Sequence, residues 1–138
     1  MNKKELDIEY GSNCEDTIFK LLRLSFDESL QKTVAYDCFD FESEKICIEV
    51  KSRRNRADKY LTTMIGYNKI KQCIDPDKAY IFVFVFTDKI MYCKYCTEDF
   101  QKFEVKKGGR LDRGKAEIRQ YVFIPITYLE ELKCDIVL

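Results

Sequence analysis

Histidine and tryptophan are both missing from this sequence of 138 residues. Without histidine, the chain cannot carry a Ser-His-Asp or Cys-His catalytic site, an HExxH metalloprotease site or a phosphohistidine. No apolar run approaches the ~20 residues that cross a bilayer, since the longest is Ala79–Phe86. A catalytic site must therefore use carboxylates, lysines, tyrosines or cysteines, and we expect no contact with a membrane.

The N-terminus and the cysteines favour an intracellular protein. Residues 1–5 already include an acidic residue, Glu5, and contain no apolar region typical of a signal peptide. The seven cysteines are an odd number and too few for a disulfide scaffold, which favours the reducing cytoplasm or nucleus. Cys93 and Cys96 form one CxxC without the further ligands that zinc requires. A zinc or redox protein is therefore only a third hypothesis.

The net charge of zero conceals an asymmetry along the chain. Residues 1–50 contain 12 acidic and 6 basic residues, and the remainder contains 12 acidic and 18 basic residues. The basic excess is concentrated in Lys51–Arg56 and again from Lys102 to Arg119. Such a distribution suits an anionic polymer held beside a metal site, although two solvated faces of an ordinary domain would have the same composition.

Hydrophobic periodicity predicts a single domain over residues 1–138, with a sheet flanked by helices. The expected order is α-β-β-α-β-β-β-α, an α/β or α+β fold. Gly108-Gly109 marks a loop, and Ser12 and Thr127 are expected helix caps. The expected helices are 12–25, 60–73 and 127–133, and the expected strands are 33–41, 46–50, 79–86, 90–95 and 120–126.

The most informative segment is the predicted hairpin of residues 33–50. Glu49 and Lys51 are two positions apart on a strand and project from one face, while Val50 points the other way. The turn brings Asp40 back opposite the stretch Cys47–Glu49, near enough for the carboxylates of Asp40 and Glu49 to share a divalent cation. Mg²⁺ commonly takes one or two carboxylates, and the Val50 carbonyl could be a further ligand. Lys51 could orient or deprotonate water or neutralise charge developing on phosphorus.

The tripeptide Glu-x-Lys has little meaning without its context. It occurs three times, at Glu49–Lys51, Glu104–Lys106 and Glu131–Lys133. Only the first follows an apolar strand, pairs through a tight turn with an aspartate-bearing strand and leads into a basic run. A cross-strand ion pair between Asp40 and Lys51 is the structural alternative.

These residues resemble the PD-(D/E)xK nuclease superfamily, in which an Asp on one strand precedes Glu-x-Lys on the next. Asp40, Glu49 and Lys51 match that pattern over about residues 11–71. The sequence also resembles phage-type Holliday-junction resolvases, in which a helical Glu precedes an Asp-Phe and then Glu-x-Lys. The resemblance implies a restriction-endonuclease-like mixed β-sheet and Glu15 as a further acid, although Glu15 could equally complete a capping box with Ser12. Asp37 remains an alternative to Asp40.

The resemblance also implies the partners of the chain. We expect a Mg²⁺- or Mn²⁺-dependent nuclease that acts on nucleic acid, on DNA rather than RNA, as a resolvase or repair endonuclease and as a homodimer. The expected metal ligands are Glu15, Asp40, Glu49 and Val50, with Lys51 as the catalytic lysine. The expected nucleic-acid contacts are Arg53, Arg54, Arg56, Tyr60 and Lys69. A non-catalytic nucleic-acid-binding or assembly module with the same fold is the main alternative.

Overall fold

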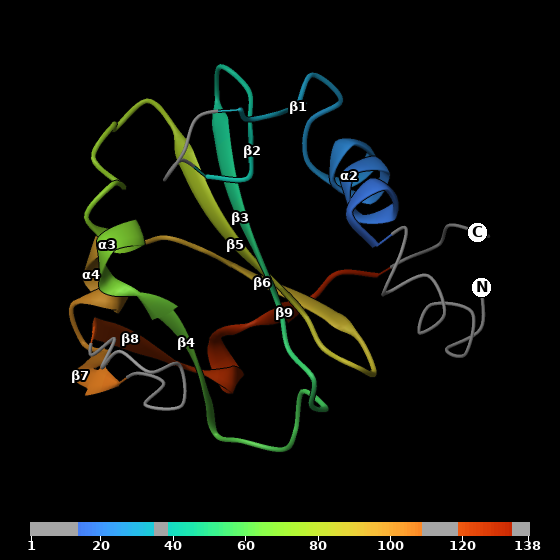
Figure 1. Ribbon diagram of the computed structural model, residues 1–138. Helices are drawn as coiled ribbons and strands as arrows, with labels where there is room; N and C mark the ends of the chain where they lie inside the picture. Colours follow the sequence, from blue (N-terminus) through green and yellow to red (C-terminus); the bar gives the residue numbers. More distant parts are fainter. Residues whose placement is uncertain (1–13, 35–38, 109–118, 134–138) are drawn as a thin grey trace.

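A mixed sheet forms the centre of the protein (Figure 1). The computed structural model describes residues 14–34, 39–108 and 119–133. Six strands pair in the order β1-β2-β3-β5-β6-β9. The strands are β1 (Gln31–Lys32), β2 (Phe41–Glu42), β3 (Ile46–Ser52), β5 (Ala79–Val85), β6 (Ile90–Lys94) and β9 (Glu130–Glu131). Strands β3 and β5 are parallel, and the other neighbours in this sheet are antiparallel.

A smaller sheet covers one face of the central sheet. Its strands pair antiparallel in the order β4-β8-β7. They are β4 (Thr62–Gly66), β7 (Glu104–Gly108) and β8 (Arg119–Pro125), accompanied by the short helices α3 (Tyr67–Ile70) and α4 (Thr97–Phe100) and the 3-10 turn η2 (Ile126–Tyr128). Helix α2 (Cys14–Ser25) covers the other face (Figure 1).

Strand β5 lies between two hydrophobic clusters. Ile81, Val83 and Val85 pack toward α2. Phe82 and Phe84 point the opposite way, toward the smaller sheet. A continuous apolar run is what a strand covered on both faces requires, which confirms the prediction for residues 79–86. The prediction of a mixed sheet flanked by helices is confirmed as well.

Several other predicted elements are present with shifted ends. The first helix is α2, which buries Ile18, Leu21 and Leu22, while its expected cap Ser12 lies outside the described residues. The strands expected at 90–95 and 120–126 are β6 and β8. The hairpin is present, but its first strand is reduced to β2, preceded by the short β1. Gly108 ends β7, and Gly109 lies outside the described residues.

The prediction of a helix over residues 60–73 is wrong. Residues 62–66 form β4, and only residues 67–70 are helical. Thr63 and Ile65 are buried, whereas Thr62 and Met64 are exposed, an alternation with a period of two residues. Pairing with β8 therefore overrides the helical spacing of Leu61, Met64 and Ile65.

The final helix predicted at 127–133 is also wrong. Residues 126–128 form η2, and residues 130–131 form β9, which pairs with β6 at the edge of the central sheet. Strand β7 and helix α4 had not been predicted. Among the residues described, no helix is long and apolar enough to span a membrane.

Candidate active site

Glu49 is a buried acid on strand β3. Glu49 is only 4% exposed, and its side chain projects with that of Cys47 toward the smaller sheet. Its neighbours Ile48 and Val50 pack on the α2 side. The alternation along the strand therefore places the carboxylate on the predicted face, but inside the protein rather than on an open surface.

Asp40 reaches the same strand from across the hairpin. Phe41 pairs with Ile48, so Asp40 lies one step beyond the pair and faces Glu49. Oδ2 of Asp40 accepts a hydrogen bond of 2.8 Å from the backbone N–H of Val50. Asp40 is itself exposed, and its expected alternative Asp37 lies outside the described residues.

Two lysines flank the Glu49 carboxylate. Nζ of Lys51 lies 3.3 Å from Oε2, and Nζ of Lys69 lies 3.7 Å from Oε1. The Lys69 side chain is 12% exposed and its ammonium group lies over the Phe39 ring, whereas the Lys51 side chain is 40% exposed. Lys69 therefore belongs to the interior of the site, and Lys51 is open to a substrate.

Burial raises the pKa of Glu49 above its ordinary value, and the negative charge of Asp40 adds to this increase. The charges of Lys51 and Lys69 oppose it. Oε1 of Glu49 is buried and accepts no hydrogen bond within the described part of the chain. An incompletely satisfied carboxylate beside a second carboxylate is an arrangement that a cation would stabilise.

The donor set fits a divalent cation. Asp40 and Glu49 supply carboxylate oxygens, and Val50, between Glu49 and Lys51, supplies the carbonyl predicted as a further ligand. Mg²⁺ is commonly held by one or two carboxylates together with water and substrate phosphate. The described residues contain no group of three or more potential ligands of the His, Cys, Asp or Glu type. Among the described residues, the carboxylates that face each other here are those of Asp40 and Glu49.

Glu15 is not brought to this pair. It lies in the first turn of α2, the helix that covers the opposite face of the central sheet. The position of Glu15 before Ile18 and Leu22 predicts a side chain that points toward the sheet. The side chain is exposed instead. A hydrogen bond with Asp16 raises the pKa of Lys32, and the charge of Glu15 contributes to the same increase. Glu15 and Asp16 therefore face solvent.

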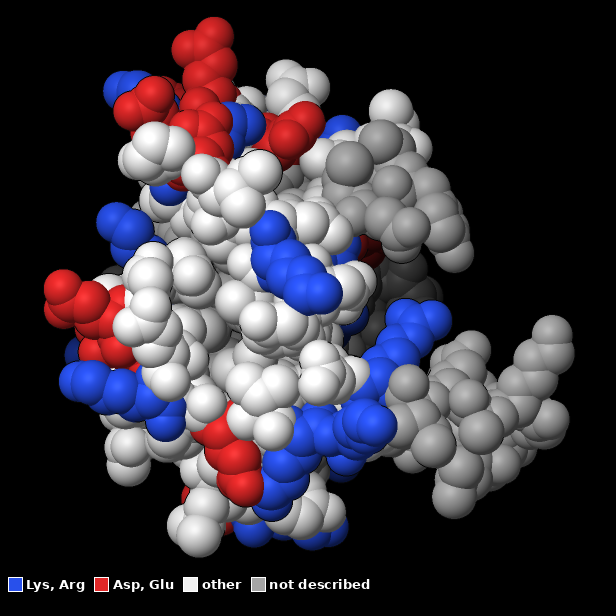
Figure 2. Space-filling view, turned by 90° about the vertical axis from the view of Figure 1, so that its left-hand side faces the viewer, with Lys and Arg blue, Asp and Glu red and all other residues white. Residues whose placement is uncertain are grey.

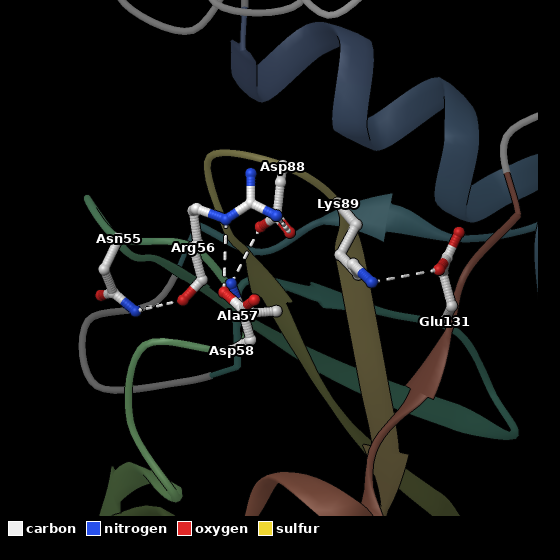
Figure 3. A network of polar contacts seen from close by, with 7 residues as sticks. All are labelled: Asn55, Arg56, Ala57, Asp58, Asp88, Lys89 and Glu131. Carbon is white, nitrogen blue, oxygen red and sulfur yellow. Dashed lines mark hydrogen bonds and ion pairs between the residues drawn. The ribbon is translucent and has the colours of Figure 1, made fainter.

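The predicted basic run follows β3 but is not uniformly exposed. Arg53 is half-buried, and its guanidinium donates to Oγ1 of Thr63 at 3.3 Å and to the Met64 carbonyl at 2.6 Å. Arg56 forms ion pairs with Asp58 and Asp88 (Figure 3). Arg54 is exposed and has no ion pair or hydrogen bond with any residue that the structure describes. Arg54 is therefore the arginine of this run best placed for a phosphate.

The other two predicted nucleic-acid contacts are separated by the structure. Tyr60 precedes β4, is 58% exposed and carries the Lys59 ammonium group over its ring. Lys69 lies beside Glu49 instead of on a solvated helix face. The contact between Lys69 and Glu49 was not predicted, because the spacing within residues 60–73 indicated one helix. No local pattern in the sequence connects Lys69 with β3.

Cys93 and Cys96 do not form a shared site. Cys93 is buried in β6, where burial raises its pKa to about 12, whereas Cys96 is exposed. A buried, protonated thiol is a poor nucleophile and a poor metal ligand. The structure thus gives the zinc or redox hypothesis no support.

A mixed sheet with Glu-x-Lys on one hairpin strand and an Asp that faces the Glu from the other strand is the arrangement of the PD-(D/E)xK class of nuclease folds. Residues 11–132 match the model of a family described as "phage putative PDDEXK endonuclease", and the chain belongs to this family. No curated protein and no solved structure matches the chain. The predicted superfamily is confirmed, and a nuclease acting on nucleic acid follows at that level.

Proposed function

We propose that this protein is a divalent-metal-dependent DNA endonuclease whose site is formed by Asp40, Glu49, Val50 and Lys51. The observation that carries the proposal is the Glu49 carboxylate, which is buried, faces Asp40 and lies 3.3 Å from the Lys51 ammonium group. A buried acid with a raised pKa next to a second acid and a lysine is typical of a functional site rather than of a structural ion pair.

Asp40 and Glu49 would hold Mg²⁺ or Mn²⁺, with the Val50 carbonyl as a further ligand. When bound, the cation would supply positive charge against the phosphodiester and lower the pKa of a water molecule. The hydrogen bond from Val50 to Asp40 holds the two strands of the hairpin in register at this point. The chain therefore positions both carboxylates before any substrate arrives.

Lys51 and Lys69 have different tasks in this proposal. Lys51 is exposed enough to reach a phosphate oxygen or the attacking water, and it would stabilise the negative charge that develops in the transition state. Lys69 is half-buried and faces the other carboxylate oxygen, so it favours the ionised form of Glu49 and orients its side chain. We therefore place Lys51 in contact with the substrate and Lys69 behind Glu49.

We further propose branched DNA as the substrate, in resolution or repair, and a homodimer as the active form. The support is the resemblance to phage-type resolvases together with the exposed Arg54 beyond β3. DNA is proposed over RNA on the same grounds. The intracellular location expected from the N-terminus and the cysteines is part of this proposal.

The test compares two Glu-x-Lys sequences of the same chain. Wild-type protein is incubated with Mg²⁺ or Mn²⁺ and a four-way junction, a flap, a duplex, single-stranded DNA and RNA. We expect Glu49→Gln and Lys51→Met to reduce the cleavage rate by about a hundredfold or more. Glu104→Gln is the matched control, because Glu104 forms a similar pair with Lys106 at 3.1 Å on the exposed strand β7.

Two results would contradict the proposal. If wild-type protein leaves every substrate intact with either metal, the chain is a nucleic-acid-binding or assembly module with a nuclease fold. If cleavage occurs and Glu49→Gln cleaves as fast as Glu104→Gln, the activity is correct but the site is elsewhere.

A further inference from the structure

A cavity of about 350 Å³ lies beyond the end of β3, outside the acidic site. Its apolar lining includes Phe86, Phe123 and Ile126, and its polar lining includes Arg53, Asn55 and Thr62. Tyr60, with a side chain that is 58% exposed, also lines it. The volume is at the lower end of the ~300–1,000 Å³ that ligand pockets occupy, and the combination of aromatic walls with a few polar groups is typical of them.

The cavity and the acidic site both lie along β3 and the segment formed by β4 and α3. At one end, Glu49 of β3 contacts Lys69 of α3. At the other end, Arg53 donates to Thr63 of β4. Because β4 leads directly into α3, these two contacts hold β3 and the β4–α3 segment side by side from the acids to the cavity. Arg53 follows β3 directly, two positions after Lys51, which corresponds to about 7 Å of extended chain.

Hydrogen bonds between the segments of its wall form the cavity before any ligand binds. The carboxylate of Asp88, in the β5–β6 turn, accepts a hydrogen bond of 2.8 Å from the backbone N–H of Ala57 (Figure 3). The backbone N–H of Thr87 donates to the Asn55 carbonyl at 3.1 Å. Ala57 is buried at the cavity wall. The segment after β3 is therefore attached to the central sheet, and no rearrangement is needed to open the cavity.

The cationic side chain in the cavity lining is Arg53, and Arg54 and Lys59 are its neighbours in the same segment of the chain, which also carries the exposed Asp58. Arg54 is exposed with no ion pair among the described residues, and the Lys59 ammonium group lies 5.5 Å from the Tyr60 ring centroid. Figure 2 shows Lys and Arg side chains gathered toward the lower right of the face drawn there, with acidic side chains beside them. Aromatic walls with cations at the rim suit a flat base attached to a phosphate backbone.

We propose that this cavity binds one unpaired nucleobase of the substrate strand, next to the phosphodiester that Lys51 would contact beside the cation of Asp40 and Glu49. The inference rests on the proposed function and narrows its substrate to nucleic acid that presents an unstacked base, at a branch, a bulge or a single-stranded end. Tyr60 stacks on the base, and Arg53, Asn55 and Thr62 contact its edge. A continuous duplex cannot fill the cavity without losing a base pair.

The test measures binding of the full-length chain in EDTA, so that cleavage plays no part. The probes are two fluorescein-labelled DNA duplexes of the same sequence, one of which contains a single unpaired 2-aminopurine. We expect wild-type protein to bind the bulged duplex about tenfold more tightly, as one base–aromatic stacking interaction predicts. The fluorescence of the 2-aminopurine should also change on binding.

Two variants and a matched control locate the base. Tyr60→Ala removes the stacking ring, and Thr62→Trp fills the cavity from an exposed strand position. Both should bind the two duplexes equally and leave the 2-aminopurine signal unchanged. Leu61→Ala should keep the preference, because Leu61 is 90% exposed and does not line the cavity.

The outcomes separate this inference from the proposed function. Equal binding of the two duplexes by wild-type protein, or a preference that survives in both variants, would overturn the cavity assignment even if the protein cleaves DNA. A chain that prefers the bulged duplex through Tyr60 but cleaves nothing with Mg²⁺ or Mn²⁺ would overturn the nuclease proposal alone.

Discussion

The ammonium group of Lys69 lies 3.7 Å from Oε1 of Glu49, although the whole of β4 separates the two residues in the sequence. Both side chains are nearly excluded from solvent, at 12% and 5% exposure. Oε1 receives no hydrogen bond from the described residues, and the positive charges of Lys51 and Lys69 together oppose the effect of its burial. Lys69 therefore connects the smaller sheet to the acid in the central sheet.

Replacing Lys69 should destabilise the protein. We expect Lys69→Met to lower the free energy of unfolding by about 1–3 kcal/mol at neutral pH, because a buried carboxylate loses one of its two cationic partners. Urea denaturation in EDTA measures the change. The control is Lys71→Met at the exposed end of the same helix, with an expected change within about 0.5 kcal/mol. Equal stability of the two variants would show that the Glu49–Lys69 pair contributes nothing.

The burial of residues 61–65 distinguishes a strand from a helix. Ile65 is 1% exposed and Leu61 is 90% exposed, although a helix would bury both. Ile65→Ala should cost about 2–5 kcal/mol, whereas Leu61→Ala should change stability by less than about 0.5 kcal/mol. Thermal or urea unfolding of both variants checks this, and a large loss for Leu61→Ala would contradict the β4–β8 pairing.

Asp27 should make stability dependent on acidic pH. Hydrogen bonds from the Ser29 and Ser43 hydroxyls lower its pKa to about 2 and join the segment after α2 to the β2–β3 turn. A lowered pKa stabilises the fold above the ordinary value of 3.8, and the contribution is lost as the pH falls toward 2. Asp27→Asn should therefore be less stable than wild type at pH 7.

The comparison is made by urea unfolding at several pH values between 7 and 2. The difference between Asp27→Asn and wild type should shrink as Asp27 becomes protonated in the wild-type fold. Glu44→Gln is the control, because Glu44 is an exposed acid of the neighbouring turn without a contact among the described residues. A constant difference over the whole range would exclude the charge of Asp27 as the cause.

The reactivity of the thiols should follow their burial. Burial raises the pKa of Cys73 and Cys93 to about 12 each, and Cys96 is exposed. Iodoacetamide at pH 8 should therefore label Cys96 in the folded protein and leave Cys73 and Cys93 unmodified until the chain is denatured. Peptide mass spectrometry reads each position. Rapid labelling of Cys93 in the folded state would reopen the redox hypothesis.

Much of the candidate site could be predicted because it depends on short-range geometry. The alternation of a strand places Glu49 and Lys51 on one face, and a tight turn brings Asp40 opposite Glu49. The same local argument identified α2 from its apolar spacing and β5 from its continuous apolar run. Each of these inferences requires only neighbouring residues or a single turn.

The errors fall where long-range pairing competes with local spacing. Leu61, Met64 and Ile65 have helical spacing, but pairing with β8, far along the chain, makes residues 62–66 a strand. Residues 130–131 likewise pair with β6 instead of continuing a helix. A strand is stabilised by a partner, and the identity of that partner is not contained in the strand itself.

By itself, the sequence without histidine determined which side chains the proposed chemistry can use, namely two carboxylates and a lysine on one hairpin followed by a basic run. Only the tertiary structure decided which residues surround that chemistry. It brought Lys69 to Glu49, attached Arg53 to β4 and left Glu15 on the opposite side of the sheet. The reason is that a strand specifies the direction of its side chains locally, whereas the packing of a second layer decides what they meet.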